Sequence, residues 1–85
     1  MNRRTGRGRR RVKVQNGMAS LIRELRKRLD LTQEKFAARL GVTFPTINRW
    51  ENGRTAPSPL AKQRIQELLR SMGRDGVDLL ARYFS

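Results

Sequence analysis

The chain has 85 residues, enough for one small domain with a modest core, and it contains neither cysteine nor histidine. This composition excludes a disulfide framework, zinc sites of the usual ligand types and Ser-His or Cys-His catalytic pairs, and no apolar run approaches the ~20 residues that span a bilayer. Lys and Arg number 20 against 7 Asp and Glu, and the formal net charge of +13 favours a polyanionic partner, either nucleic acid or an anionic membrane surface.

The N-terminal segment carries a large share of this charge. It has no acidic residue and no helical apolar stripe, so we predict a basic, flexible arm over residues 1–17, with a short strand at Val12 and Val14 as an alternative. Arg7-Gly8-Arg9 resembles the core of an AT-hook. Three roles stay open for the arm: a reach into a DNA minor groove, nonspecific attraction to phosphates, and a solubilising extension with no native role. The basic residues concerned are Arg7, Arg9, Arg10 and Arg11.

The first helical pattern begins at Met18, with Asn16 as a possible N-cap. Its apolar residues recur at the spacing of one helix face. They are Met18, Leu21, Ile22, Leu25 and Leu29.

Two short helices follow. Thr32 is a good N-cap for a second helix, which ends at Gly41. Thr43 caps a third helix that runs to about Asn52, before Gly53.

A fourth helix starts with Ser58 as N-cap and Pro59 at the first helical position, where the missing N–H is not needed, and Gly73 is a natural C-cap. A last helical segment covers residues 75–84. The five helices, without a confident strand, predict an all-α fold: one compact bundle over residues 18–85.

The second and third helices have the spacing of a helix-turn-helix over residues 33–52. Ala37 is small where two steeply crossing helices touch, and Gly41 allows the positive φ of the sharp turn. The residues predicted to fill the wedge between the helices are Leu40, Val42, Ile47 and Trp50.

The stretch LTQEKFAARLGVTFPTINRWENGR resembles the Cro/cI-type (Xre-like) helix-turn-helix DNA-binding family, and the resemblance covers about residues 18–72. It implies a five-helix bundle of the lambda-repressor type that often binds operator DNA as a dimer. It also implies an ion pair between Arg26 and Glu51. The residues that would contact phosphates are Gln33, Thr43, Asn52 and Arg54, with backbone N–H groups near Asn52, and the positions that would read bases are Phe44, Pro45, Thr46 and Arg49.

Helix geometry adds a second line of reasoning about the third helix. At about 100° per residue, Pro45, Asn48, Arg49 and Asn52 face away from Ile47 and the core. Arg49 suits guanine O6 and N7, and Asn48 suits adenine N6 and N7 in a major groove.

Phe44 and Pro45 depart from the polar residues that usually occupy these positions in the family. Phe44 has two readings: a lid over the core residue Ile47, or a contact with a thymine methyl group. Pro45 is mainly structural, because the first turn of a helix does not need its N–H.

The last segment has two apolar stripes, and one short helix seldom needs both for its own core. Residues 75–84 are therefore a candidate homodimer surface, although burial of both stripes within the bundle stays open. The stripes are Val77, Leu80 and Phe84, and Leu79 and Tyr83.

These observations predict a sequence-specific double-stranded DNA-binding protein, a small bacterial or phage transcriptional regulator in the cytoplasm that is nucleoid-associated when bound. Related alternatives are an autoregulating antitoxin and the DNA-reading segment of a larger DNA-acting protein. An alternative of another class is an RNA-binding or bridging protein that uses the Arg-rich arm. We expect no enzyme activity, cofactor, metal, membrane or small-molecule ligand, since no metal ligands, nucleophile-base pair or phosphate-binding loop are visible.

Overall fold

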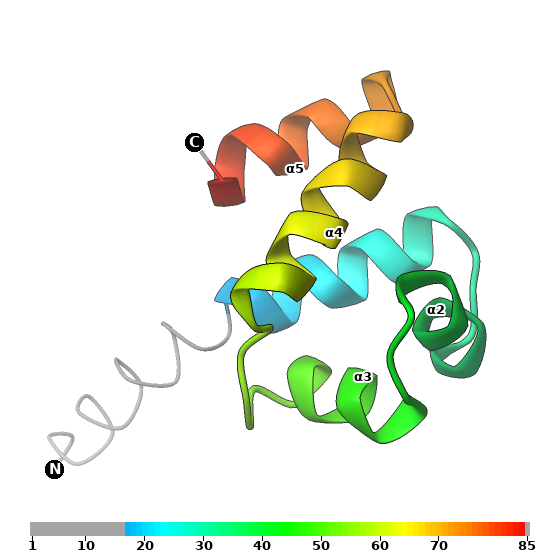
Figure 1. Cartoon of the computed structure of the whole chain (residues 1–85). Coiled ribbons are helices and arrows are strands. Elements are labelled where there is room, and N and C mark those ends of the chain that lie inside the picture. Colours follow the sequence, from blue (N-terminus) through cyan, green and yellow to red (C-terminus); the bar gives the residue numbers. More distant parts are fainter. Residues whose placement is uncertain (1–16, 85) are drawn as a thin grey trace, which may run out of the picture.

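The computed structural model describes residues 17–84, and in that part of the chain it contains five helices and no strand (Figure 1). The first helix covers residues 17–28, and it is followed by α2 (Gln33–Leu40), α3 (Phe44–Glu51), α4 (Pro59–Ser71) and α5 (Arg74–Phe84). The predicted all-α bundle is confirmed. The first helix includes Gly17, one residue before the Met18 at which the helical pattern begins in the sequence. The predicted arm, the alternative strand and the Asn16 cap lie outside the described residues.

Two of the predicted helix starts have the expected capping chemistry. The Thr32 hydroxyl accepts a hydrogen bond from the Lys35 backbone N–H at 3.1 Å, and the Ser58 hydroxyl accepts one from the Ala61 N–H at 3.2 Å. Each hydroxyl thereby satisfies one of the N–H groups that a helix leaves without a partner in its first turn.

Thr43 is the N-cap residue of α3, as predicted, but its side chain makes no capping hydrogen bond. Thr43 holds the N-cap position, but its hydroxyl lies 3.0 Å from the Thr46 hydroxyl and accepts no backbone N–H. The reason lies in the first turn: Pro45 has no N–H, and the N–H of Thr46 donates to the Thr43 carbonyl oxygen at 3.1 Å.

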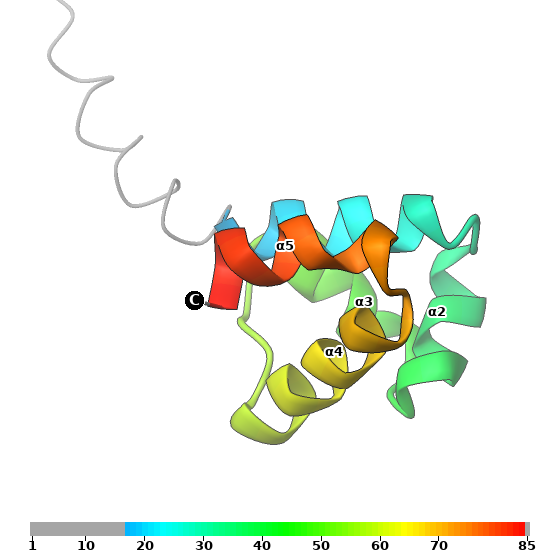
Figure 2. The same cartoon turned by 90° about the horizontal axis from the view of Figure 1, so that it is seen from above.

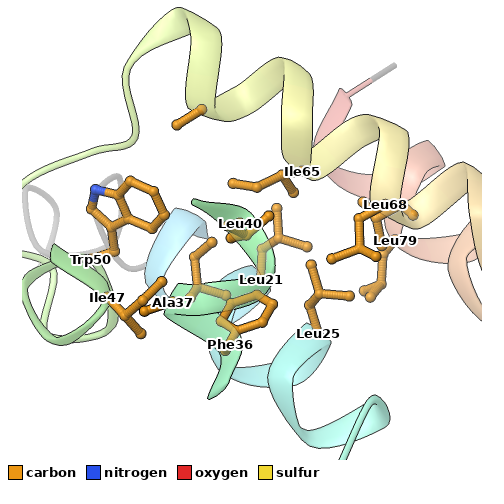
Figure 3. Close-up of a cluster of buried hydrophobic side chains, with 13 residues drawn as sticks. Leu21, Leu25, Phe36, Ala37, Leu40, Ile47, Trp50, Ile65, Leu68 and Leu79 are labelled. Atoms are coloured by element: carbon orange, nitrogen blue, oxygen red, sulfur yellow. The ribbon is translucent and has the colours of Figure 1, made fainter. Parts of the chain in front are cut away.

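A single hydrophobic core brings all five helices together, as the inward-pointing side chains in Figure 3 show. The apolar face predicted for the first helix contributes to it, as do apolar residues of α4, with Met18, Leu29 and Met72 partly buried at its edge. The largest fully buried side chains are Phe36, Leu21, Ile22, Leu25, Ile47, Ile65, Leu69 and Leu79.

A close crossing joins α4 to α5. Gly76 is buried in this crossing, and a Cβ atom at this position would overlap the backbone carbonyl of Leu69. Glycine is therefore needed here for backbone contact, since no side chain fits between the two helices.

An ion pair ties α5 to the first helix, over which it runs in the opposite direction (Figure 2). Arg28 donates to both carboxylate oxygens of Asp78, at 2.7 and 3.0 Å, and to the carbonyl of Asp75 at 2.7 Å. The bidentate hydrogen bonding raises the pKa of Arg28 and lowers the pKa of Asp78 from 3.8 to about 2. No spacing or motif in the sequence indicated this contact between Arg28 and Asp78.

Candidate nucleic-acid interface

The turn between α2 and α3 has the geometry that the helix-turn-helix spacing predicts. Gly41 has φ of +74°, and the N–H of Val42 donates back to the Ala37 carbonyl at 2.9 Å. Arg64 from α4 donates to the Leu40 carbonyl at 3.0 Å, which places a cation at the C-terminal end of α2. The turn is therefore held by its own backbone and by α4.

The inner face of α3 is buried. Ile47 is fully buried and Trp50 nearly so, and both belong to the same cluster as Ala37 (Figure 3). Val42 is partly buried against this cluster. The wedge role predicted for these residues agrees with their burial.

Glu51, at the last position of α3, is 4% exposed and is the one buried charged residue among residues 17–84. Arg26 of the first helix donates to both of its carboxylate oxygens, from Nε to Oε2 at 2.6 Å and from Nη2 to Oε1 at 3.1 Å. These hydrogen bonds and the carboxylate charge raise the pKa of Arg26 against the opposing effect of its burial. The pair implied by the family resemblance is thus present, and it fixes α3 against the first helix.

Arg23, one turn before Arg26, also contacts the end of α3. Its Nη1 donates to the backbone carbonyl of Glu51. A cation at the C-terminal end of a helix is electrostatically favourable, so Arg23 stabilises the position of α3 as well. No sequence motif indicated this residue; its spacing of one turn from Arg26 was the available signal.

A chain of side-chain hydrogen bonds leads from Glu51 along the surface of α3. Gln33 Nε2 donates to Glu51 Oε1 at 2.9 Å, and Asn48 Nδ2 donates to Gln33 Oε1 at 3.3 Å. Asn52 Nδ2 donates to Asn48 Oδ1 at 3.0 Å. We call Glu51, Gln33, Asn48 and Asn52 the amide relay. Sequence reasoning treated its three amides as independent DNA contacts and missed that they bond to one another.

The outer face of α3 presents the remaining predicted readers. Pro45 and Arg49 are exposed and Thr46 is half-buried. Among the described residues, the Arg49 guanidinium has no hydrogen-bond or ion-pair partner, so it is available to a ligand.

Phe44, the first residue of α3, is 44% exposed and lies outside the core cluster. Phe44 is therefore not part of the buried core, and its contact with a thymine methyl group stays a prediction. The N-terminal start of the helix places the ring at the protein surface, beside the other exposed positions of α3.

The turn after α3 has fewer free backbone donors than the family resemblance implies. The N–H groups of Asn52, Gly53 and Arg54 donate to the carbonyls of Asn48, Trp50 and Arg49 at 3.1, 3.1 and 2.9 Å. A phosphate at this turn would be bound chiefly by the side chains of Asn52 and Arg54, both of which are exposed.

Two further observations concern membrane-spanning helices and metal sites. In residues 17–84, no helix is long and apolar enough to cross a membrane, and no cluster of three or more carboxylate, His or Cys residues could hold a metal ion. The predicted arm residues, Arg7, Arg9, Arg10 and Arg11, lie outside the described part of the chain.

Comparison with known proteins gives two matches. The family described as Helix-turn-helix matches residues 22–73. The chain is also 48% identical over 61 residues to an uncharacterized HTH-type transcriptional regulator of Methanothermobacter thermautotrophicus, an alignment that covers 72% of this chain and 84% of that protein. No solved structure matches the chain.

Proposed function

The chain belongs to the Cro/cI-like helix-turn-helix family, and from this premise we propose that it binds a specific double-stranded DNA sequence as a small transcriptional regulator. The observation that carries the proposal is the division of α3 into two faces. Ile47, Trp50 and Glu51 fix one face in the bundle, while the opposite face presents an unpaired arginine to solvent. A regulator of this kind would act in the cytoplasm, associated with the nucleoid.

In this proposal α3 enters the major groove and Arg49 is the principal base reader. Its guanidinium can donate two hydrogen bonds to guanine O6 and N7. Phe44, exposed at the start of α3, would contact a thymine methyl group, and Pro45 and Thr46 would line the same part of the groove. Specificity at these base pairs would therefore come from one charged and one apolar contact.

Phosphate contacts would flank α3 on both sides. The side chain of Gln33 keeps one N–H beyond its bond to Glu51, and Thr43 is exposed before α3. Asn52 and Arg54 would bind a phosphate after α3. The basic arm, with Arg7, Arg9, Arg10 and Arg11, would add minor-groove or phosphate contacts.

The experiment that tests base reading is selection of bound duplexes from a random pool at physiological salt, with the wild-type chain and with Arg49→Ala. We expect the wild type to enrich a motif containing a guanine that Arg49→Ala no longer selects. Arg74→Ala removes the same charge at the exposed start of α5 and is the matched control, which should keep the motif. Enrichment of no motif by the wild type, or equal enrichment of structured RNA in competition, would refute the proposal.

The arm is tested by the salt dependence of binding. Each phosphate that the protein neutralises contributes about −0.9 to the slope of log affinity against log salt concentration. Removal of residues 1–14 should therefore make the slope shallower. An unchanged slope would mean that the arm does not contact the DNA backbone.

We also propose that the chain binds DNA as a homodimer through α5. Val77 is 58% exposed and lies on a shallow apolar groove between α4 and α5, with the half-buried Leu80 and Phe84. Leu79 is fully buried in the bundle and Leu80, Tyr83 and Phe84 pack partly against its core, so Val77 is the exposed member of the two stripes of α5. Two half-sites of such a dimer would lie about 34 Å apart on the DNA.

Self-association is measured by sedimentation over a range of protein concentrations, with and without DNA. Val77→Asp should weaken it, because a charge in an apolar interface is costly. Leu60 is exposed to the same extent, 58%, on α4, so Leu60→Asp is the matched control and should leave self-association unchanged. A mass that stays monomeric at all concentrations, free and DNA-bound, would contradict the dimer.

A further inference from the structure

The hydrogen bonds of the amide relay all run one way: each amide donates to the member before it, and Glu51 is the first acceptor. A side-chain amide has nearly the same shape in its two orientations, so its hydrogen-bond partners decide which end is the donor. The Glu51 carboxylate can only accept, and it is already fixed by Arg26. Gln33 must therefore turn its NH2 group toward Glu51 and its oxygen toward Asn48, as observed.

The same logic carries the orientation onward to α3. Since Gln33 offers an oxygen, Asn48 must turn its NH2 group toward Gln33. The Asn48 oxygen then faces Asn52, which donates to it. A single buried carboxylate thus determines the orientation of three amides on the DNA-facing side of the domain.

This orientation limits what Asn48 can offer to a base. Its oxygen already accepts from Asn52 and one of its two N–H groups donates to Gln33, so one N–H and one oxygen lone pair remain, in the orientation that the relay sets. Recognition of adenine by asparagine requires a donor to N7 and an acceptor from N6 at the same time, so both remaining groups would have to meet the base edge without leaving the relay. The side chain is also half-buried, in contrast to the exposed and unpaired Arg49.

We propose that Asn48 is a positioning residue of the interface: through the relay that begins at Glu51 it holds Gln33 and α3 in the binding geometry, and it does not read adenine. Base readout by α3 then depends on Arg49 and Phe44. This inference rests on the proposed DNA binding, and it replaces the adenine contact that helix geometry had suggested for Asn48.

The relay itself is tested without DNA. Thermal unfolding is measured for the full-length wild type, Gln33→Ala, Asn48→Ala and the double variant. If Asn48 acts through Gln33, the second substitution should add little to the loss in melting temperature caused by the first. Fully additive losses would show that the two amides are not coupled and would overturn the relay.

The positioning role is tested with DNA, by duplex selection and by affinity for the selected sequence. We expect Asn48→Ala to weaken binding several-fold while the selected motif stays the same, and to cause no further weakening in the Gln33→Ala background. Asn48→Asp separates the roles further, because an aspartate that replaced a base-reading asparagine would favour cytosine through its N4 donor. With a positioning role, Asn48→Asp weakens binding and leaves the motif unchanged.

The outcomes are distinct. Loss of an adenine preference at one base pair in Asn48→Ala, or its replacement by cytosine in Asn48→Asp, would overturn the proposal. If the wild type enriches no motif although unfolding shows coupling, the proposed function fails and the readout role of α3 fails with it, whereas the relay stands as a stabilising feature of the fold.

Discussion

Glu51→Ala should destabilise the domain severely, because the Glu51 carboxylate accepts hydrogen bonds from side chains of two other helices, the first helix and α2. Glu51 is 4% exposed, and its carboxylate receives two hydrogen bonds from Arg26 and one from Gln33. Its removal leaves the Arg26 guanidinium, whose side chain is 24% exposed, without its counter-ion at the contact between the first helix and α3. It also leaves the Gln33 amide without its acceptor.

The magnitude follows from this environment. Breaking a buried ion pair by removing one partner costs about 3–5 kcal/mol, and the partial exposure of Arg26 argues for the lower end, about 3 kcal/mol. A domain of this size has a total stability of about 5–15 kcal/mol. Since each kcal/mol shifts the melting temperature of a domain this size by roughly 4–8 °C, the loss should be more than about 12 °C.

The assay is thermal unfolding followed by circular dichroism. The control is Glu24→Ala, which removes a carboxylate from the same helix as Arg26. Glu24 pairs with Arg28 at 3.0 Å, but its side chain is 46% exposed, so we expect a loss of less than about 0.5 kcal/mol. A Glu51→Ala melting temperature within a few degrees of the wild type would refute the assignment of Glu51 as the residue that holds α3 in place.

Three further predictions follow from contacts outside the interface. Gly76→Ala should destabilise the domain by about 1–3 kcal/mol in urea unfolding, because a Cβ overlaps the backbone of α4; a stability equal to that of the wild type would contradict the close crossing. Asp78→Asn should lower the melting temperature at pH 7 and much less at pH 2. The folded-state pKa of Asp78 is depressed, so its stabilising contact with Arg28 is complete above pH 3.8 and is lost as the pH falls toward about 2; a pH-independent difference would contradict this pairing. Thr32→Ala should cost about 1 kcal/mol, and Thr43→Ala less, since only the first hydroxyl accepts from a backbone N–H; equal losses in chemical unfolding would count against the capping assignment.

The sequence predicted those parts of the fold that depend on local chemistry. The starts of α2 and α4 follow from Thr32 and Ser58, and the turn before α3 follows from Gly41, because caps and positive φ angles require particular residues at particular places. The Arg26–Glu51 pair was implied by the family resemblance, and in the structure Glu51 is buried while the side chain of Arg26 is 24% exposed.

The remaining features depend on how elements distant in the sequence meet. Arg28 and Asp78 are 50 positions apart, and their contact depends on the register of α5, which the crossing at Gly76 sets. Periodicity placed Phe44 at the edge of the buried face, but whether its ring turned inward depended on side-chain packing. The amide relay likewise depends on side-chain conformations on two helices, which no spacing rule specifies.

The central claim is that α3 is the surface that meets DNA. Titration of the ¹⁵N-labelled full-length chain with the selected duplex, followed by NMR, tests it most directly. We expect the largest changes in amide resonances over α3, from Phe44 to Arg49, and at Gln33, with much smaller changes along the first helix. Large changes confined to the basic arm or to α5, with α3 unaffected, would contradict the account.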